Sequence, residues 1–141
     1  MNNVSVSTHI PIDIHELWRK VGHFGDIAAW HPLLARGESL GNEPGALRHY
    51  ETRDGMRQVE RLDEMDPEHH TYRYTLQRSG LPVTNYTGEL HVDELSDHTS
   101  LLTWTVHFDV TNGTDAEGVD RVVDFIAQGL DGIKRGLEMA H

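Results

Sequence analysis

The sequence contains no cysteine among its 141 residues. Disulfide bonds, thiolate metal ligands and thiol nucleophiles are therefore excluded, so any chemistry must use histidine, carboxylate or hydroxyl groups. The absence of cysteine fits a reducing compartment, and a cytoplasmic location is expected. The first residues also lack the basic and apolar regions of a secretory signal, so export is not expected.

Basic residues are few: 12 lysines and arginines stand against 23 aspartates and glutamates, for a formal net charge of −11. The average field of such a surface repels a phosphate backbone, so nucleic acid is not an expected partner. Long apolar runs are missing too, because no stretch approaches the ~18 consecutive apolar residues of a membrane helix. Stable membrane insertion is therefore not expected.

Eleven histidines are present, but their spacing is not that of a metal site. The sequence has no HExxH, no His-x-His and no tight carboxylate cluster. The adjacent residues His69 and His70 would point to opposite sides if they lie on a strand. Nucleophile elbows, phosphate loops and dinucleotide fingerprints are missing as well. We therefore expect neither a metal nor any other cofactor.

A single domain over residues 1–141 is predicted, because the chain has no internal repeat, linker or low-complexity tract and is long enough for one core. Apolar and polar residues alternate over 4–10, which predicts a first strand. A capping box of Asp13 and Glu16 predicts a short helix after it. A second short helical turn is expected over 26–30.

Six more strands are predicted in the middle of the chain, where short alternating segments are separated by turn residues. They cover residues 33–40, 46–53, 56–65, 70–78, 83–95 and 99–111. The short connections favour an antiparallel meander.

The last part of the chain carries the longest helical pattern, which a capping box of Thr114 and Glu117 opens. Its apolar side chains recur on one face, which must lie against an apolar surface. These side chains are Val119, Val122, Val123, Ile126, Leu130, Ile133 and Leu137. The element order predicts an α+β fold in which a curved antiparallel sheet of about seven strands wraps a long C-terminal helix.

Several short motifs resemble those of a known superfamily. They are Pro11-x-Asp13-x-x-x-Leu17-Trp18, Phe24-Gly25 then Trp30-His31-Pro32, Gly45-x-x-Arg48, Gly55 then Glu60-Arg61-Leu62, and Gly129-Leu130. Over nearly the whole chain they resemble the START-like superfamily, which includes birch-pollen-type allergens, and more narrowly the bacterial polyketide cyclase/dehydrase and lipid-transport (SRPBCC) family. The resemblance implies a helix-grip fold around a deep, largely apolar cavity. It leaves function open, because this fold hosts carriers, receptors, cyclases and chaperone activators.

Aromatic residues on the inward faces of the predicted strands are candidates for the cavity wall. Tyrosine and tryptophan combine an apolar body with a hydrogen-bonding tip, which suits a mostly apolar ligand with a few polar groups. The candidate ligand-binding residues are Trp30, Glu60, Tyr72, Tyr74, Tyr86, Trp104 and Phe108. Plain core packing is the alternative for the aromatic residues, and Trp30 is either a structural plug or a ligand-facing lid.

Glycines at 129, 132 and 136 lie along one flank of the long helix. They make room either for a ligand or for close packing of the helix, and the sequence leaves both interpretations open.

The Asp54-Gly55 turn bears on the environment of Glu60. A two-residue hairpin loop places His49 opposite Glu60, whereas a slip of one residue pairs Arg48 with Glu60 instead. In either register Glu60 is a partly buried acid that serves as a general base, a ligand acceptor or an ion-pair partner. Glu60 and His49 are the candidate catalytic residues.

The leading functional prediction is a protein, monomeric or homodimeric, that binds a small hydrophobic or aromatic molecule of lipid or polyketide type. One alternative is a polyketide cyclase or dehydratase in which Glu60, His49 or a tyrosine transfers protons. Another is an interaction module of the chaperone-activator type, which would use the acidic surface and the long helix.

Overall fold

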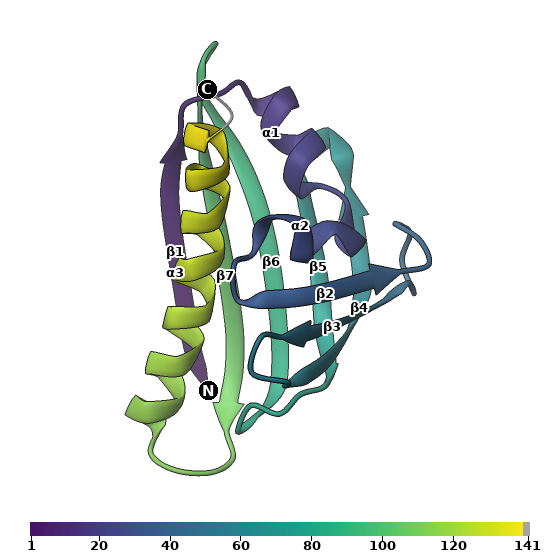
Figure 1. Cartoon of the computed structure of the whole chain (residues 1–141), viewed down its shortest axis with the longest axis vertical. Coiled ribbons are helices and arrows are strands. Elements are labelled where there is room, and N and C mark those ends of the chain that lie inside the picture. The colour runs from purple at the N-terminus through teal and green to yellow at the C-terminus, as the bar shows by residue number, and fades with distance from the viewer. Residues whose placement is uncertain (140–141) are drawn as a thin grey trace.

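Seven strands form one antiparallel sheet that curls around a long helix (Figure 1). The structure is a computed structural model and describes residues 1–139. Its strands are β1 (Asn2–Ile10), β2 (Leu34–Ser39), β3 (Leu47–Thr52), β4 (Arg57–Asp66), β5 (Thr71–Arg78), β6 (Val83–Ser96) and β7 (Thr99–Val110). Its helices are α1 (Ile14–Val21), α2 (Ile27–Trp30) and α3 (Asp115–Met139), with short 3-10 turns over Phe24–Asp26 and Pro67–His69.

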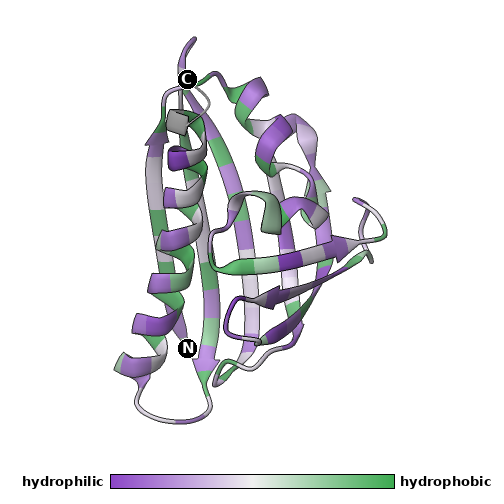
Figure 2. Ribbon diagram, viewed as in Figure 1, coloured by the Kyte–Doolittle hydropathy of each residue, from purple (hydrophilic) through white to green (hydrophobic). Residues whose placement is uncertain are grey.

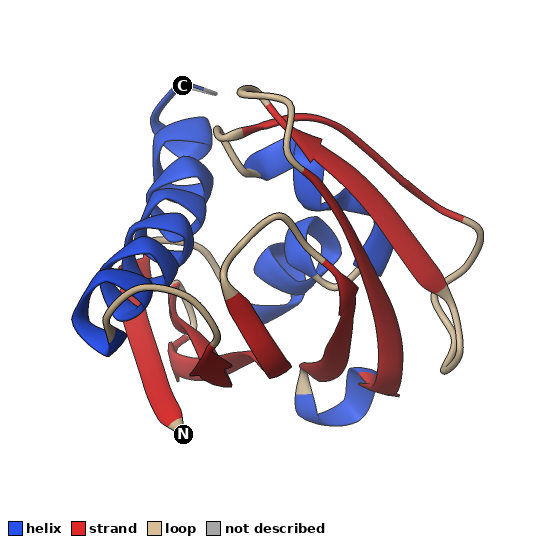
Figure 3. Ribbon diagram, turned by 90° about the horizontal axis from the view of Figure 1, so that it is seen from below, coloured by secondary structure: helices blue, strands red, loops and turns tan. Residues whose placement is uncertain are grey.

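The strand order is β1-β7-β6-β5-β4-β3-β2, so each strand from β2 to β7 pairs with its neighbours in the chain and β1 closes on β7. This is the predicted meander, and each predicted strand is present with ends shifted by at most two residues. Seen from below, α3 lies along β1 at one end of the sheet, and the rest of the sheet bends away from it (Figure 3). The helix-grip prediction is confirmed.

Side chains of the two predicted N-caps hold the helix starts. Asp13 Oδ1 accepts a hydrogen bond from the backbone N–H of Glu16 at 3.0 Å. Thr114 Oγ1 accepts one from the backbone N–H of Glu117 at 3.2 Å. Each cap satisfies one of the amide donors that the first turn of a helix leaves free.

Hydrophobic and hydrophilic residues alternate along α3 and along the strands (Figure 2). The buried apolar side chains of α3 are Val122, Ile126, Leu130, Ile133 and Leu137. Val123 was predicted to lie on this face but is exposed. Phe125, which the pattern did not include, packs partly buried against the core instead. No described helix has both the length and the apolar composition needed to cross a membrane.

The hairpin between β3 and β4 corrects the predicted loop. Its loop has three residues, since the Thr52 N–H donates to the Met56 carbonyl at 2.8 Å and Gly55 adopts a φ of +90°. A glycine with positive φ after a tight turn is typical of three-residue hairpin loops. The Thr52 hydroxyl also accepts from the Met56 N–H at 2.9 Å, which stabilises the longer loop.

This loop sets the register of the two strands. Arg48 lies opposite Glu60, and His49 lies opposite Val59. The prediction that a two-residue loop pairs His49 with Glu60 is therefore wrong, and the one-residue slip is the observed arrangement. Because side chains alternate along a strand, His49 is exposed on the outer face while Glu60 is buried.

Two of the three helix glycines make close packing contacts. A Cβ on Gly129 would lie 2.7 Å from Cδ2 of His31 and 2.8 Å from Cζ3 of Trp104. A Cβ on Gly132 would lie 2.3 Å from a backbone oxygen of α2. At Gly136 nothing lies within 4 Å. At the first two positions the space is taken by the protein itself, which favours the packing interpretation.

These contacts predict opposite effects of the same substitution in one helix. Gly129→Ala should lower the free energy of unfolding by about 1–3 kcal/mol, because the added methyl group overpacks the contact with His31. Gly136→Ala should raise it by up to about 1 kcal/mol, because alanine favours an exposed helix. Urea unfolding measures both values, and equal effects at the two positions would contradict the packing described here.

Candidate functional site

An ion pair between Arg48 and Glu60 lies in the interior. The two residues are directly opposite each other on β3 and β4, and their side chains are 1% and 3% exposed. Glu60 Oε1 accepts a hydrogen bond from Arg48 Nε at 2.7 Å and lies 2.7 Å from Nη2. Two charges removed from water need further polar partners to offset their desolvation.

Those partners come from the 3-10 turn before α2, from β5 and from β3 itself. Arg48 Nη1 donates to the backbone carbonyl of Phe24 at 2.9 Å and to the Tyr72 hydroxyl at 3.2 Å. The Tyr50 hydroxyl donates to Glu60 Oε2 at 3.1 Å. The Phe24 ring also lies over the guanidinium, with 4.1 Å between its centroid and Cζ. The buried charges are thus held by hydrogen bonds and a cation–π contact.

Burial and the ion pair shift the pKa values of this cluster. Burial opposes the charge on Arg48, but the Glu60 carboxylate and the neighbouring tyrosines outweigh it and raise the pKa of Arg48. Burial is also the main cause that raises the pKa of each tyrosine in the interior. These tyrosines are Tyr50, Tyr72, Tyr74 and Tyr86. Their hydroxyls therefore stay protonated and can donate hydrogen bonds at neutral pH.

The structure brings the predicted aromatic residues together. Tyr72, Tyr74, Tyr86, Trp104 and Phe108 are all buried, and they point inward from β5, β6 and β7. Trp104 Nε1 donates to the Tyr74 hydroxyl at 2.8 Å, and the rings of Tyr86 and Phe108 lie 5.8 Å apart. A Cβ on the residue opposite Tyr74, Gly88, would lie 2.2 Å from the tyrosine ring. The Tyr74 ring therefore occupies space that any other residue at position 88 would fill with its side chain.

Two hollows of the protein lie away from these aromatic residues. One, of about 760 Å³, crosses the outer side of β2 to β5. The other, of about 610 Å³, lies between the loop before β6 and the first turns of α3. None of the seven predicted ligand-binding residues lines either hollow. In the interior these aromatic rings contact one another, so their role in ligand binding stays a prediction.

Two buried donors in the interior have no hydrogen-bond acceptor within the described part of the chain. They are Trp30 Nε1 and Arg48 Nη2. The second lies beside the Glu60 oxygen that Nε already uses, but not in hydrogen-bonding geometry. Unpaired buried donors are rare and costly, so each calls for an explanation.

The Trp30-His31-Pro32 segment, at the end of α2, contacts α3. His31 is 1% exposed, its Nδ1 accepts from the Leu33 N–H at 3.2 Å and its Nε2 donates to the Phe125 carbonyl at 2.8 Å. This pattern requires a neutral imidazole, and burial lowers the pKa of His31 to about 4. The Trp30 ring lies 5.8 Å from that of Trp104. These contacts hold the segment against α3, and the choice between a structural plug and a ligand-facing lid at Trp30 stays a prediction.

Three residues of this cluster were not among the sequence-based candidates: Phe24, Tyr50 and Phe125. Tyr50 alternates with Arg48, so the correct hairpin register would have placed it on the inner face. The other two are single aromatic residues in helical segments, where periodicity gives no sign of what they contact. His49, a predicted catalytic residue, lies outside the cluster on the other face of β3.

No group of three or more histidine or acidic side chains in residues 1–139 is placed to hold a metal ion.

Known proteins share both the sequence pattern and the fold. The family model described as "Polyketide cyclase / dehydrase and lipid transport" matches residues 1–138. No curated protein matches the chain. The solved structure of XoxI from Bacillus cereus is 25% identical with a TM-score of 0.91, covering 100% of this chain and 99% of that one.

Two further solved structures are similar to the chain. An uncharacterised protein from Bacillus thuringiensis is 25% identical with a TM-score of 0.89, covering 96% of this chain and 98% of that one. The Zhui aromatase/cyclase from a Streptomyces species is 16% identical with a TM-score of 0.82, covering 97% and 93%. At that identity the likeness to the aromatase/cyclase shows the fold alone.

The buried ion pair predicts a large cost for removing one partner. Arg48→Met should lower the free energy of unfolding by about 3–5 kcal/mol, because Glu60 is then buried without its counter-charge. The double variant Arg48→Met with Glu60→Met should be less destabilised than the sum of the single variants. Denaturant unfolding measures all three, and additive effects would contradict the pairing. Arg36→Met, which breaks an exposed pair with Glu51, should cost less than about 1 kcal/mol.

The buried imidazole predicts a stability that falls with acid. The ordinary pKa of His31 is 6.5 and its folded value is about 4, so between these values the unfolded chain binds a proton that the folded chain does not. Stability from His31 is thus complete above pH 6.5 and lost as the pH falls towards 4, by up to about 3 kcal/mol. Unfolding at pH 7, 5 and 4 should show a smaller loss in His31→Gln than in the wild type. If the free energy of unfolding falls equally with pH in both proteins, His31 is not a buried neutral histidine.

Proposed function

Because the chain belongs to the polyketide cyclase/dehydrase and lipid-transport family, we propose that it binds a small aromatic or hydrophobic molecule in the interior between α3 and the sheet. The observation that carries the proposal is the buried indole donor Trp30 Nε1, which has no acceptor in residues 1–139, together with Arg48 Nη2, which is ion-paired with Glu60 but makes no hydrogen bond. An acceptor oxygen on a ligand would complete the hydrogen bonding of both donors.

Both donors belong to one continuous aromatic wall. The Trp30 ring contacts Trp104, the Trp104 indole donates to the Tyr74 hydroxyl, and the Tyr74 ring lies 4.8 Å from Cζ of Arg48. A flat ligand against this wall would meet apolar ring faces along its length and donors near its ends. Burial of its apolar surface at ~25 cal/mol per Å² is sufficient for micromolar affinity.

The charge of the cluster bears on the chemistry of the ligand. Glu60 balances Arg48, so the buried pair is neutral as a unit. A neutral ligand with a hydroxyl or carbonyl oxygen fits such a site better than an anion, which would meet the Glu60 carboxylate within the same cluster.

Phe125 of α3 packs against one end of this wall. Its ring is half-buried, stacks on Tyr50 with 6.3 Å between centroids, and lies 6.0 Å from Trp104. It therefore joins α3 to β3 by a contact between two side chains. Rotation of this ring would open space beside Trp104 without breaking any backbone hydrogen bond.

A cyclase reaction is less well supported by the geometry. The predicted proton-transfer pair of Glu60 and His49 is not formed, because His49 is on the outer face. Glu60 already accepts hydrogen bonds from Arg48 and Tyr50. Such a carboxylate is a poor general base, because proton uptake would break the ion pair.

The binding proposal predicts a preference for a neutral ligand over an anion, and one substitution should weaken this preference. Wild-type protein should bind 1-naphthol with a micromolar dissociation constant and more tightly than 1-naphthoate, with a change in tryptophan fluorescence. Glu60→Gln leaves Arg48 without its counter-charge, so 1-naphthoate should then bind about tenfold more tightly than to the wild type. Calorimetric titration measures the four constants.

The control for this experiment is Glu64→Gln, which neutralises an exposed carboxylate of the same strand and should leave the preference unchanged. Thermal unfolding of each variant verifies that it is folded. The proposal is wrong if neither compound, nor a wider panel of hydrophobic molecules, alters the fluorescence or the melting temperature.

A further inference from the structure

The outer face of β2 to β5 carries the larger of the two hollows, with a volume of about 760 Å³. We call it the outer groove. Three arginines, from three different strands, line it together with two glutamates, a histidine and a valine. These residues are Arg36, Arg57, Arg78, Glu38, Glu51, His49 and Val59. Small-molecule sites commonly have volumes in this range.

The strand registers order these side chains in two rows. In the first row Glu51 lies between Arg36 and Arg57. The second row runs Glu38, His49, Val59, Arg78 from β2 to β5. Because opposite residues share a face of the sheet, all seven side chains point to the same outer side.

Irregular pairing on both sides of the groove shapes it. The register shifts in β2 between Leu34 and Arg36, and between β4 and β5 next to Val59. The second shift leaves Gln77 without an opposite residue, so that Arg78 faces outward beside Val59. Bulges of this kind bend a strand and redirect a side chain, and they are frequent next to functional sites.

The arginines of the groove differ in how they are partnered. Arg36 Nε lies 2.7 Å from a carboxylate oxygen of Glu51. Arg57 and Arg78 form no ion pair with any residue in 1–139. The groove thus carries three arginines against two glutamates, in a chain with a formal net charge of −11. Positive charge gathered in a hollow of an acidic protein attracts anions locally.

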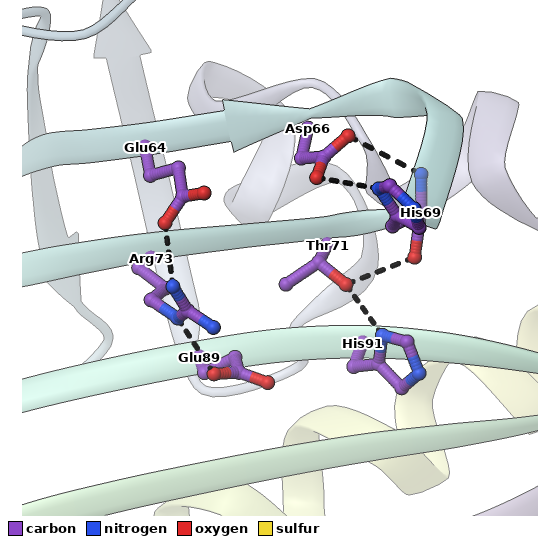
Figure 4. A network of polar contacts seen from close by, with 7 residues as sticks. All are labelled: Glu64, Asp66, His69, Thr71, Arg73, Glu89 and His91. Atoms are coloured by element: carbon purple, nitrogen blue, oxygen red, sulfur yellow. Dashed lines mark hydrogen bonds and ion pairs between the residues drawn. The ribbon is translucent and has the colours of Figure 1, made fainter.

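Arg73, another arginine on the same outer face, is neutralised by carboxylates of the chain itself. Arg73 of β5 lies between Glu64 and Glu89, with contacts of 2.5 Å and 2.8 Å (Figure 4). Each of its two neighbouring strands therefore supplies a carboxylate. Arg57 and Arg78 have no such partners, and their guanidinium groups can bind an oxygen anion from outside the chain.

We propose that the outer groove is a second ligand site, which binds the carboxylate or phosphate group of a small organic anion. Arg57 and Arg78 hold the anionic oxygens by charge-assisted hydrogen bonds, and Val59 contacts the carbon skeleton. The site lies on the opposite face of β3 and β4 from the buried ion pair. It is independent of the interior site and does not require that site to bind anything.

The test uses citrate as the carboxylate probe and pyrophosphate as the phosphate probe, in separate titrations at 150 mM NaCl. The side-chain Nε–H signals of the arginines report binding by NMR. Wild-type protein should show saturable shifts at Arg57 and Arg78 with at least one probe. Arg57→Gln and Arg78→Gln should each weaken that binding about tenfold, since each removes one charge-assisted contact. The probe that binds more tightly identifies the anionic group.

Arg73→Gln is the matched control, because it removes an arginine of the same face that two carboxylates already neutralise. It should leave the affinity for both probes within twofold of the wild type. Non-saturable shifts with both probes, or an equal loss of affinity in Arg73→Gln, would overturn the proposal. Arg57→Gln should also leave 1-naphthol binding unchanged, which separates the failure of this site from that of the interior site.

Discussion

The buried ion pair of Arg48 and Glu60 is the constraint on which the interior depends. A charged pair in a core is costly unless most of its remaining hydrogen-bonding groups are satisfied. Here the backbone at Phe24, the hydroxyls of Tyr50 and Tyr72, and the Phe24 ring supply those contacts for all of these groups except Arg48 Nη2. The pair therefore links the turn before α2 with β3, β4 and β5, and moving any of these elements would expose a desolvated charge.

The Trp30-His31-Pro32 segment, at the other side of the interior, is held by a neutral histidine rather than by an ion pair. His31 is held neutral, and it joins the end of α2 to a backbone carbonyl in the middle of α3. That contact requires α3 to approach closely, which Gly129 permits because any side chain there would meet His31 and Trp104. Gly129 thus lowers the helix propensity of α3 but allows α3 to lie close to the end of α2. One turn away on α3, the Phe125 ring stacks on Tyr50 of β3.

Much of the fold could be predicted from the sequence, because alternation, capping boxes and turn residues are local signals. The strands, the N-caps and the inward faces of β5 to β7 follow from such signals alone. Local signals did not decide the β3–β4 register, since Asp54-Gly55 suits both a two-residue and a three-residue loop. They also gave no basis for choosing Phe125 over Val123 on α3. That choice depends on the ring stack with Tyr50, a contact between residues far apart in the chain.

One residue of loop length therefore decides the chemistry of both faces of the sheet. With three residues in the loop, Glu60 meets Arg48 inside and His49 meets Val59 outside. With two, Glu60 would face an imidazole and its charge would lack a permanent counter-ion, because histidine is mostly neutral at pH 7. The longer loop gives Glu60 a guanidinium that is always charged. It also leaves His49 exposed beside the arginines of the outer groove. The positive φ of Gly55 is thus the local feature from which the two proposed sites follow.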